Sequence, residues 1–247
     1  TMIIGLGYWA VDDVNISVIP QYDAQLDKVI FGSTGSWGVP LAYYQVPTTQ
    51  LSPITFGGVV SNQGVADINV TFSAICPGVY EGVSDPTLLA PSTQDTLYGM
   101  STNPMGIIDT AIFYPPATPA IHTIEFSVAT DAAEVEEDIA NNVFPSYTVD
   151  VNEYIYARDL GIATSGTSNS GYEYEVGNIF DIYADQLLYS IDVVARTSSA
   201  IGAEVRAKLY SIDSATGDFI FITESDILAI DVGDLGNIKS YALMNFM

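Results

Sequence analysis

Residues 66–74 alternate between apolar and polar side chains, with Ile68, Val70 and Phe72 at alternate positions. Successive side chains of a β-strand point to opposite faces of a sheet, so this period of two predicts a strand with one face in a core. Similar runs recur along the first half of the chain. We expect further strands at residues 14–18, 24–31, 54–61, 79–84, 93–98, 123–130 and 144–151.

The second half of the chain shows the same signal in shorter pieces. We expect strands there at residues 177–182, 187–195, 203–212 and 219–222. Residues 213–218 are rich in Asp, Ser and Gly and predict a hairpin turn between the last two of these strands. In the first half, the turn at residues 62–64 predicts that residues 54–61 and 66–74 also form a hairpin.

Only one stretch, residues 131–142, has a sequence pattern that suggests a helix. It is acidic and lacks a wide apolar stripe, which favours an exposed loop or a single turn over a stable helix. Short strands separated by Gly, Asn and Pro turns, without βαβ alternation, indicate β-sandwiches. The sequence therefore predicts an all-β chain of tandem antiparallel β-sandwiches, immunoglobulin-like or jelly-roll-like, with no substantial helix.

The strand pattern suggests three parts. Residues 21–151 are expected to form one sandwich, and residues 152–247 a second sandwich that is incomplete. Residues 1–20 carry a strand without a nearby partner, which is either the terminal strand of a preceding module or a strand donated to a neighbouring subunit. The last residues, 241–247, are apolar, whereas native ends are usually polar and frayed, so we expect a section of a longer protein.

The charge balance limits the partners of the chain. It has 30 acidic residues against 6 Lys and Arg, for a net charge of −24. Such a surface repels phosphate backbones and anionic lipids, so we expect no nucleic-acid binding. No window offers about 18 consecutive apolar residues, so we expect no membrane insertion by a helix. The acidic surface suits either solubility in a salty medium or the binding of divalent cations such as calcium.

The chain has one cysteine, Cys76, and one histidine, His122. An intrachain disulfide is therefore impossible, and zinc sites and Cys/His catalytic pairs are nearly excluded. Cys76 follows a strand-like run and is expected to be a buried, inert thiol. A Ser-His-Asp arrangement through His122 is formally open, but no Gly-x-Ser-x-Gly motif accompanies it. We expect no enzyme activity and no catalytic residues.

Two sets of residues are candidates for binding. Trp37 lies in a Gly-rich loop with Tyr43 and Tyr44 close behind, and aromatic faces of this kind can stack on sugars. Core packing or loop anchoring is the plainer interpretation of Trp37. The acidic residues of 131–138 could gather oxygen ligands around a cation, but they lack EF-hand spacing, which favours a solvated loop.

Three local patterns resemble modules of large secreted proteins. Residues 7–14, GYWAVDDV, resemble the last strand of the jelly-roll modules (cleaved-adhesin or MAM-like) of secreted Bacteroidetes proteins. The chain also resembles a CARDB-type module, the bacterial cell-adhesion-related immunoglobulin-like domain, at residues 60–64 with 68–72 and at residues 136–138 before 141–142. Residues 203–213 resemble a second β-sandwich found in surface proteins exported by the type IX system.

These resemblances imply an extracellular or cell-surface protein of an aquatic bacterium. In the jelly-roll family the Asp-Asp step can help to coordinate calcium, which makes Asp12 and Asp13 candidate metal ligands; the alternative is an exposed strand entry. The leading expectation is a non-catalytic structural or adhesive module, such as a fibre subunit, whose partners are neighbouring domains or identical subunits. The alternative is a carbohydrate-binding accessory module of a secreted hydrolase, with polysaccharide as its partner.

Overall fold

The computed structural model describes residues 18–32, 43–102, 108–110, 112–131, 135–136, 138–158, 166 and 171–244. The chain divides into two compact units. The first comprises Thr1–Ala42 and Ser52–Val151, and the second comprises Tyr43–Leu51 and Asn152–Met247. The strand predicted at residues 14–18 lies, except for Val18, outside the described residues.

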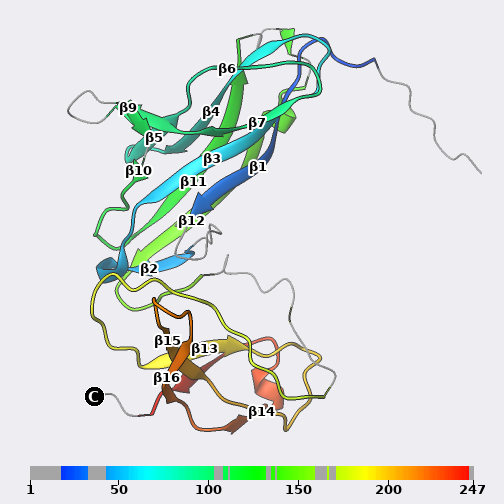
Figure 1. Cartoon of the computed structure of the whole chain (residues 1–247). Helices are drawn as coiled ribbons and strands as arrows, with labels where there is room; N and C mark the ends of the chain where they lie inside the picture. Colours follow the sequence, from blue (N-terminus) through cyan, green and yellow to red (C-terminus); the bar gives the residue numbers. More distant parts are fainter. Residues whose placement is uncertain are drawn as a thin grey trace, which may run out of the picture. The chain divides into compact units, whose positions relative to one another are not determined.

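One sheet of the first unit is organised around β3 (Ile54–Asn62), as Figure 1 shows. The strand β1 (Ala24–Gly32) pairs antiparallel with one edge of β3. The strands β7 (Gln94–Tyr98) and β10 (Ile112–Phe113) pair antiparallel with successive stretches of β3, β7 at residues 57–61 and β10 at residues 54–55. The strand β3 is buried at most positions.

The other sheet of the first unit is organised around β4 (Ile68–Cys76). Its antiparallel order runs β12–β11–β4–β5–β8–β9, and β6 also pairs with β4. The bounds of the other strands are β5 (Tyr80–Val83), β6 (Thr87–Leu89), β8 (Met100–Thr102), β9 (Ile108–Thr110), β11 (Ala120–Thr130) and β12 (Val143–Asn152).

The core of the first unit lies between these two sheets. Phe56 of β3 lies 5.6 Å from Phe126 of β11, measured between ring centroids, and Phe126 stacks on Phe72 of β4 at 6.4 Å. All three rings are buried. Aromatic side chains contribute large apolar areas, so this cluster supplies much of the hydrophobic stabilisation. The first unit is therefore a β-sandwich-like body, as the alternation of its strands predicts.

The hairpin predicted for residues 54–61 and 66–74 is wrong. These residues form β3 and β4, which belong to opposite sheets, so the link between them crosses from one layer to the other. The Asn62 side chain holds that link: its Nδ2 donates to the carbonyl of Ala66 at 2.8 Å, and its Oδ1 accepts from the backbone of Gly64 at 2.9 Å. An alternating pattern identifies a half-buried strand, but it does not identify the neighbouring strand.

The second unit is built from shorter ladders. The strand β13 (Ser190–Val194) pairs with β18 (Ile238–Ala242), β14 (Glu204–Val205) with β17 (Leu228–Ala229), and β15 (Lys208–Ile212) with β16 (Phe219–Glu224), all antiparallel. The predicted hairpin over residues 213–218 is confirmed. Asp213 donates its backbone N–H to the carbonyl of Asp218 at 2.9 Å, and Gly217 takes the positive φ of 79° that the turn requires.

Three strand predictions for the second unit need correction. Residues 177–182 form no ladder, and within residues 187–195 only β13 is a strand. The single strand predicted at residues 203–212 is two strands, β14 and β15, which pair with different partners. The segment at residues 43–51 also belongs to this unit, with β2 (Gln45–Pro47) and the 3-10 turn η1 (Thr48–Gln50). Gln45 forms an antiparallel bridge to Ala157. Backbone and side-chain hydrogen bonds to residues far away in sequence hold these segments.

Helical structure in the described residues is limited to short turns. They include η3 (Ala140–Asn142), which falls within the acidic stretch predicted to be a loop or a single turn, and η4 (Val232–Asp234). Among the described residues, no helix has the length and apolar character needed to cross a membrane. The prediction of an all-β, antiparallel, sandwich-like chain without substantial helix is confirmed.

Candidate functional site

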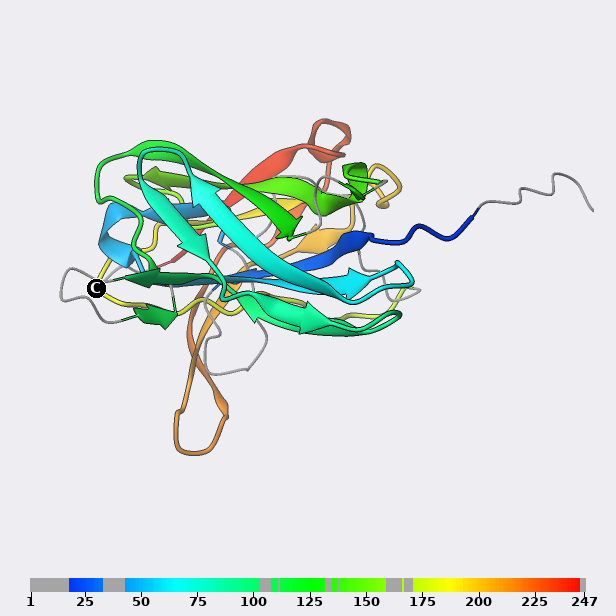
Figure 2. The same ribbon diagram turned by 90° about the horizontal axis from the view of Figure 1, so that it is seen from above.

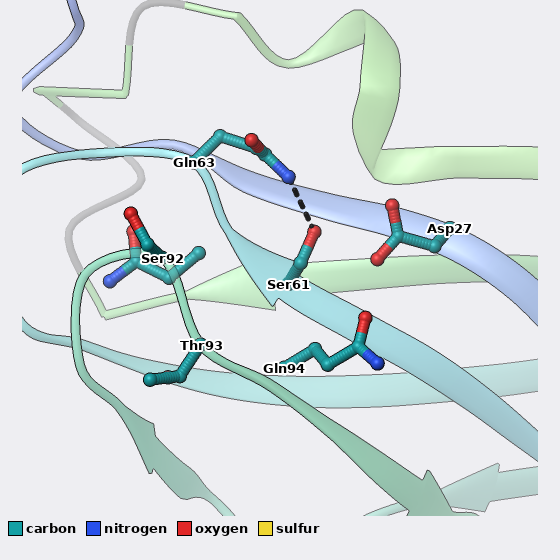
Figure 3. A pocket seen from close by; sticks show the side chains of 7 residues that line it. Asp27, Ser61, Gln63, Ser92, Thr93 and Gln94 are labelled. Atoms are coloured by element: carbon teal, nitrogen blue, oxygen red, sulfur yellow. Dashed lines mark hydrogen bonds between the residues drawn. The ribbon is translucent and has the colours of Figure 1, made fainter.

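A polar hollow of about 300 Å³ lies on the first unit, beside the end of β3 (Figure 3). It lies between β1, the end of β3 and the turn that leads into β7. Each of the residues that line it carries a hydroxyl, amide or carboxylate group: Asp27, Ser61, Asn62, Gln63, Ser92, Thr93 and Gln94. This composition suits a neutral, hydrogen-bonding ligand better than an apolar one.

Backbone hydrogen bonds fix the wall of this hollow opposite β1. Ser92 donates its N–H to the carbonyl of Asn62, and Asn62 donates its own N–H to the carbonyl of Thr93, both at 2.9 Å. Thr93 closes a β-turn by donating to the carbonyl of Ala90 at 3.1 Å. Ser92 occupies the third position of that turn with φ 62°, a conformation that glycine adopts more readily. Non-glycine residues in this region are often found at functional sites.

The chemistry of the hollow is hydrogen bonding. Gln63 Nε2 donates to Ser61 Oγ at 2.8 Å, the contact dashed in Figure 3, and Gln94 lines the hollow from the start of β7. Among the residues that line it, Asp27 is the one charged side chain, and none is a histidine or cysteine. The side chains of the hollow therefore present mainly neutral hydrogen-bond donors and acceptors.

Tyr43 is placed in the core of the second unit. It is 2 % exposed, and its ring stacks on Tyr156 at 4.7 Å between centroids. The guanidinium carbon of Arg158 lies 4.4 Å from the centroid of the same ring. The Tyr43 hydroxyl accepts from the backbone N–H of Asp181 at 3.0 Å, and burial raises the pKa of this phenol. Protein side chains therefore surround the Tyr43 ring.

Of the three predicted sugar-binding residues, the structure describes Tyr43 and Tyr44. Tyr44 is half-buried and is held by its backbone N–H, which donates to the carbonyl of Ala157 at 2.9 Å. Trp37 lies outside the described residues, as do the predicted metal ligands Asp12 and Asp13. The polar hollow was missed by sequence reasoning because its residues come from three separated segments, and no local motif marks them.

Cys76 and His122 are both buried, at 4 % and 6 % exposure. Burial raises the pKa of the Cys76 thiol, which disfavours the reactive thiolate. His122 packs edge-on against Phe113, its Nε2 is buried without a hydrogen bond, and burial lowers its pKa. Both residues therefore have the environment of core side chains.

The second unit exposes a large apolar surface. Phe219, Ile220, Phe221 and Ile222, four consecutive residues of β16, are each more than half exposed. Because side chains alternate along a strand, both faces of the β15–β16 hairpin are apolar. Tyr210 of β15 lies edge-on to Phe219 and Phe221, so these rings share one face. Figure 2 shows the hairpin in orange.

The comparisons with known proteins assign this chain to no family. No protein-family model matches the chain, and no curated protein matches its sequence. The resemblance to CARDB-type and jelly-roll modules stays a prediction.

Proposed function

We propose that this chain is a non-catalytic structural or adhesive module of a larger secreted or cell-surface protein, and that it associates with identical subunits through its second unit. The observation that carries this proposal is the β15–β16 hairpin, whose two faces are both apolar and exposed. Exposed contiguous apolar surface usually marks a site of association.

The hairpin has the features expected of a surface that binds a partner. A two-stranded hairpin is marginally stable alone, and a third strand or a packed face stabilises it. With about 150–250 Å² for each aromatic side chain, the two exposed phenylalanines alone contribute roughly 200 Å² of surface to be covered. Five of the six basic residues of the chain lie in this unit: Arg158, Arg196, Arg206, Lys208 and Lys239. Their positive charges reduce the electrostatic repulsion between copies of this acidic chain.

Sedimentation velocity and electron microscopy of the purified chain test this association. We expect a concentration-dependent shift to dimers or filaments between about 1 and 100 µM, the affinity range of weak interfaces. Replacing Phe219→Ser together with Phe221→Ser should abolish the shift. A control pair of exposed apolar residues on the first unit, Leu88→Ser with Ile121→Ser, should leave it unchanged. A monodisperse monomer at all concentrations would contradict the proposal.

A second candidate function is carbohydrate binding at the polar hollow. Its lining of hydroxyls and amides can exchange hydrogen bonds with sugar hydroxyls. Calorimetric titration with neutral polysaccharides should give a binding isotherm that Ser61→Ala and Gln94→Ala each weaken. Replacement of the exposed Thr216, far along the chain in the 213–218 turn, by Ala serves as the control. Flat isotherms across a panel of glycans would remove this candidate.

A further inference from the structure

The outer edge of β15, which faces away from β16, is open to another strand. In the described part of the chain, β15 pairs with β16 alone. At one end of the hairpin Asp213 donates its N–H to the carbonyl of Asp218, and at the other end Ser225 donates to the carbonyl of Ala207, both at 2.9 Å. These bonds turn the odd-numbered residues of the strand toward β16. The backbone groups that face outward therefore belong to the alternate residues Lys208, Tyr210 and Ile212.

The other edge of the hairpin, on β16, is poorly suited to pairing with a copy of itself. An acidic residue stands at each end, Asp218 before the strand and Glu224 as its last residue. Antiparallel pairing of two β16 strands would bring Asp218 of one copy toward Glu224 of the other, and like charges across strands are destabilising. The register of the hairpin also shifts at Ile222, which has no residue opposite it on β15. Such a bulge disrupts further pairing at a sheet edge.

The strand β15 carries opposite charges at its two ends. Lys208 is its first residue, and Asp213 follows its last. When two β15 strands pair antiparallel, the beginning of each strand lies beside the end of the other, so Lys208 of one copy approaches Asp213 of the second copy. Lys208 also forms an ion pair with Glu175 of its own copy. An ammonium group has three donors, so Lys208 can contact both carboxylates. The charges of β15 therefore favour a second copy of the same strand as its partner.

We propose that two copies of the chain pair antiparallel through the outer edges of β15, with Tyr210 opposite Tyr210 of the second copy. This inference rests on the proposed self-association and specifies its geometry. In this register Lys208 lies opposite Ile212 of the second copy, so all the outward-facing residues of both strands take part. Each hydrogen-bonded pair of an antiparallel ladder exchanges two bonds, which gives about six backbone hydrogen bonds between the copies. A register shifted by two residues would lose one of these pairs.

This pairing also joins the aromatic side chains of the two hairpins. The ring of Tyr210 lies edge-on to Phe219 at 6.2 Å and to Phe221 at 5.8 Å between centroids. Antiparallel pairing about a two-fold axis keeps this face of the hairpin on the same side in both copies. The two Tyr210 side chains then lie side by side at the centre of one apolar face on a four-stranded sheet. A sheet of three or more strands with an apolar face is stable where a single hairpin is marginal.

Disulfide trapping in the full chain tests this register. The Cα atoms of a hydrogen-bonded antiparallel pair lie about 5.5 Å apart, which a disulfide can span. Tyr210→Cys should therefore form a covalent dimer on oxidation with diamide. Ser211→Cys is the matched control: its two Cα atoms would be offset by two positions along the strands and lie roughly 8 Å apart, beyond the reach of a disulfide. We expect at least about tenfold more covalent dimer for Tyr210→Cys than for Ser211→Cys. The natural Cys76 is buried and is present in both variants.

A second measurement leaves β15 unchanged. A nitroxide spin label on Thr216→Cys lies in the turn of the hairpin, where residue 216 is exposed. Antiparallel pairing places the turns of the two copies on opposite sides of Tyr210, so electron paramagnetic resonance should find the labels about 20 Å or more apart. This distance decides the geometry if Tyr210→Cys itself weakens association.

The outcomes separate this geometry from self-association in general. Dimers in sedimentation velocity, together with trapping at residue 210 and distant turn labels, would support the β15 pairing. Dimers with equal trapping at residues 210 and 211, or with turn labels close together, would overturn this pairing and leave the proposed association standing. A monodisperse monomer at all concentrations would contradict the proposed association, and the β15 pairing with it.

Discussion

Gly58 of β3 faces the ring of Phe72 of β4 so closely that a Cβ atom on Gly58 would lie 2.5 Å from Phe72 Cδ2. The same atom would lie 2.8 Å from Cδ1 of Leu26 on β1. Phe72 is completely buried and cannot swing away into solvent. The two sheets of the first unit therefore approach each other at a point where only glycine fits.

Gly58→Ala should destabilise the first unit by about 1–3 kcal/mol, because overpacking forces side chains or backbone to shift. Urea denaturation followed by circular dichroism measures this change. Gly177→Ala is the control, since nothing lies within 4 Å of a Cβ at Gly177; it should stay within about 0.5 kcal/mol of the original chain. Equal stability of the two variants would show that the sheets do not meet at Gly58.

Asn62→Ala should cost about 2–4 kcal/mol, because it removes the partners of several buried backbone groups at once. Asn62 is 0 % exposed, and its Nδ2 donates to the carbonyls of Ala66 and of Leu89, the latter at 3.0 Å. Thermal unfolding measures the loss. Asn237→Ala removes a single exposed hydrogen bond to Gly233 and should change stability by less than about 1 kcal/mol. A similar loss in both variants would contradict a structural role for Asn62.

Gln50→Ala should destabilise the second unit by about 1–3 kcal/mol. Gln50 is 2 % exposed; its Nε2 donates to the carbonyl of Ala184 at 2.8 Å, and its Oε1 accepts from the backbone N–H of Tyr183 at 2.8 Å. Proteolysis with a broad-specificity protease, monitored by mass spectrometry, should show faster cleavage within residues 171–189. Asn178→Ala, an exposed substitution within the same segment, should be cleaved at the original rate.

The first unit should lose stability as the pH falls through about 6.5, the ordinary pKa of histidine. Burial lowers the pKa of His122 in the folded state, so the unfolded chain binds more protons in this range. The loss levels off below the lowered folded pKa. Melting temperatures of the original chain and of His122→Phe between pH 7.5 and 5.5 check this, because the carboxylates contribute equally to both. Parallel curves would show that His122 titrates normally when folded.

The strands of the first unit were predictable because each has one face in the core. The alternation in β4, for example, follows directly from burial of Ile68, Val70 and Phe72 between half-buried neighbours. The prediction of a strand at residues 177–182 was wrong, because these residues do not have one face in a core. The residues of this segment are stabilised by contacts of Arg158 and Tyr156 with Ile179 and Asp181, and a local pattern carries no information about such distant partners.

Whether a candidate site could be predicted also depended on whether neighbouring residues or distant segments form it. Acidic residues near 136 were visible as a possible cation site, but the contacts around them were not. Asp23 meets Asn141, and Ala24 meets Glu136, only when the start of β1 packs beside the β11–β12 connection. Tyr43 could be interpreted as a sugar platform or as a core residue, and its burial against Tyr156 depends on a segment more than a hundred positions away.

The amino-acid sequence by itself determined the all-β class, the positions of most strands in the first unit and the turn between β15 and β16, because side-chain alternation and turn preferences are local. Only the tertiary structure decided that β3 and β4 lie in opposite sheets, that the polar hollow forms beside Asn62, and that the backbone of Ala24 meets Glu136. Each of these depends on which distant segments pair, and pairing is set by packing of the whole core and not by any single stretch of chain.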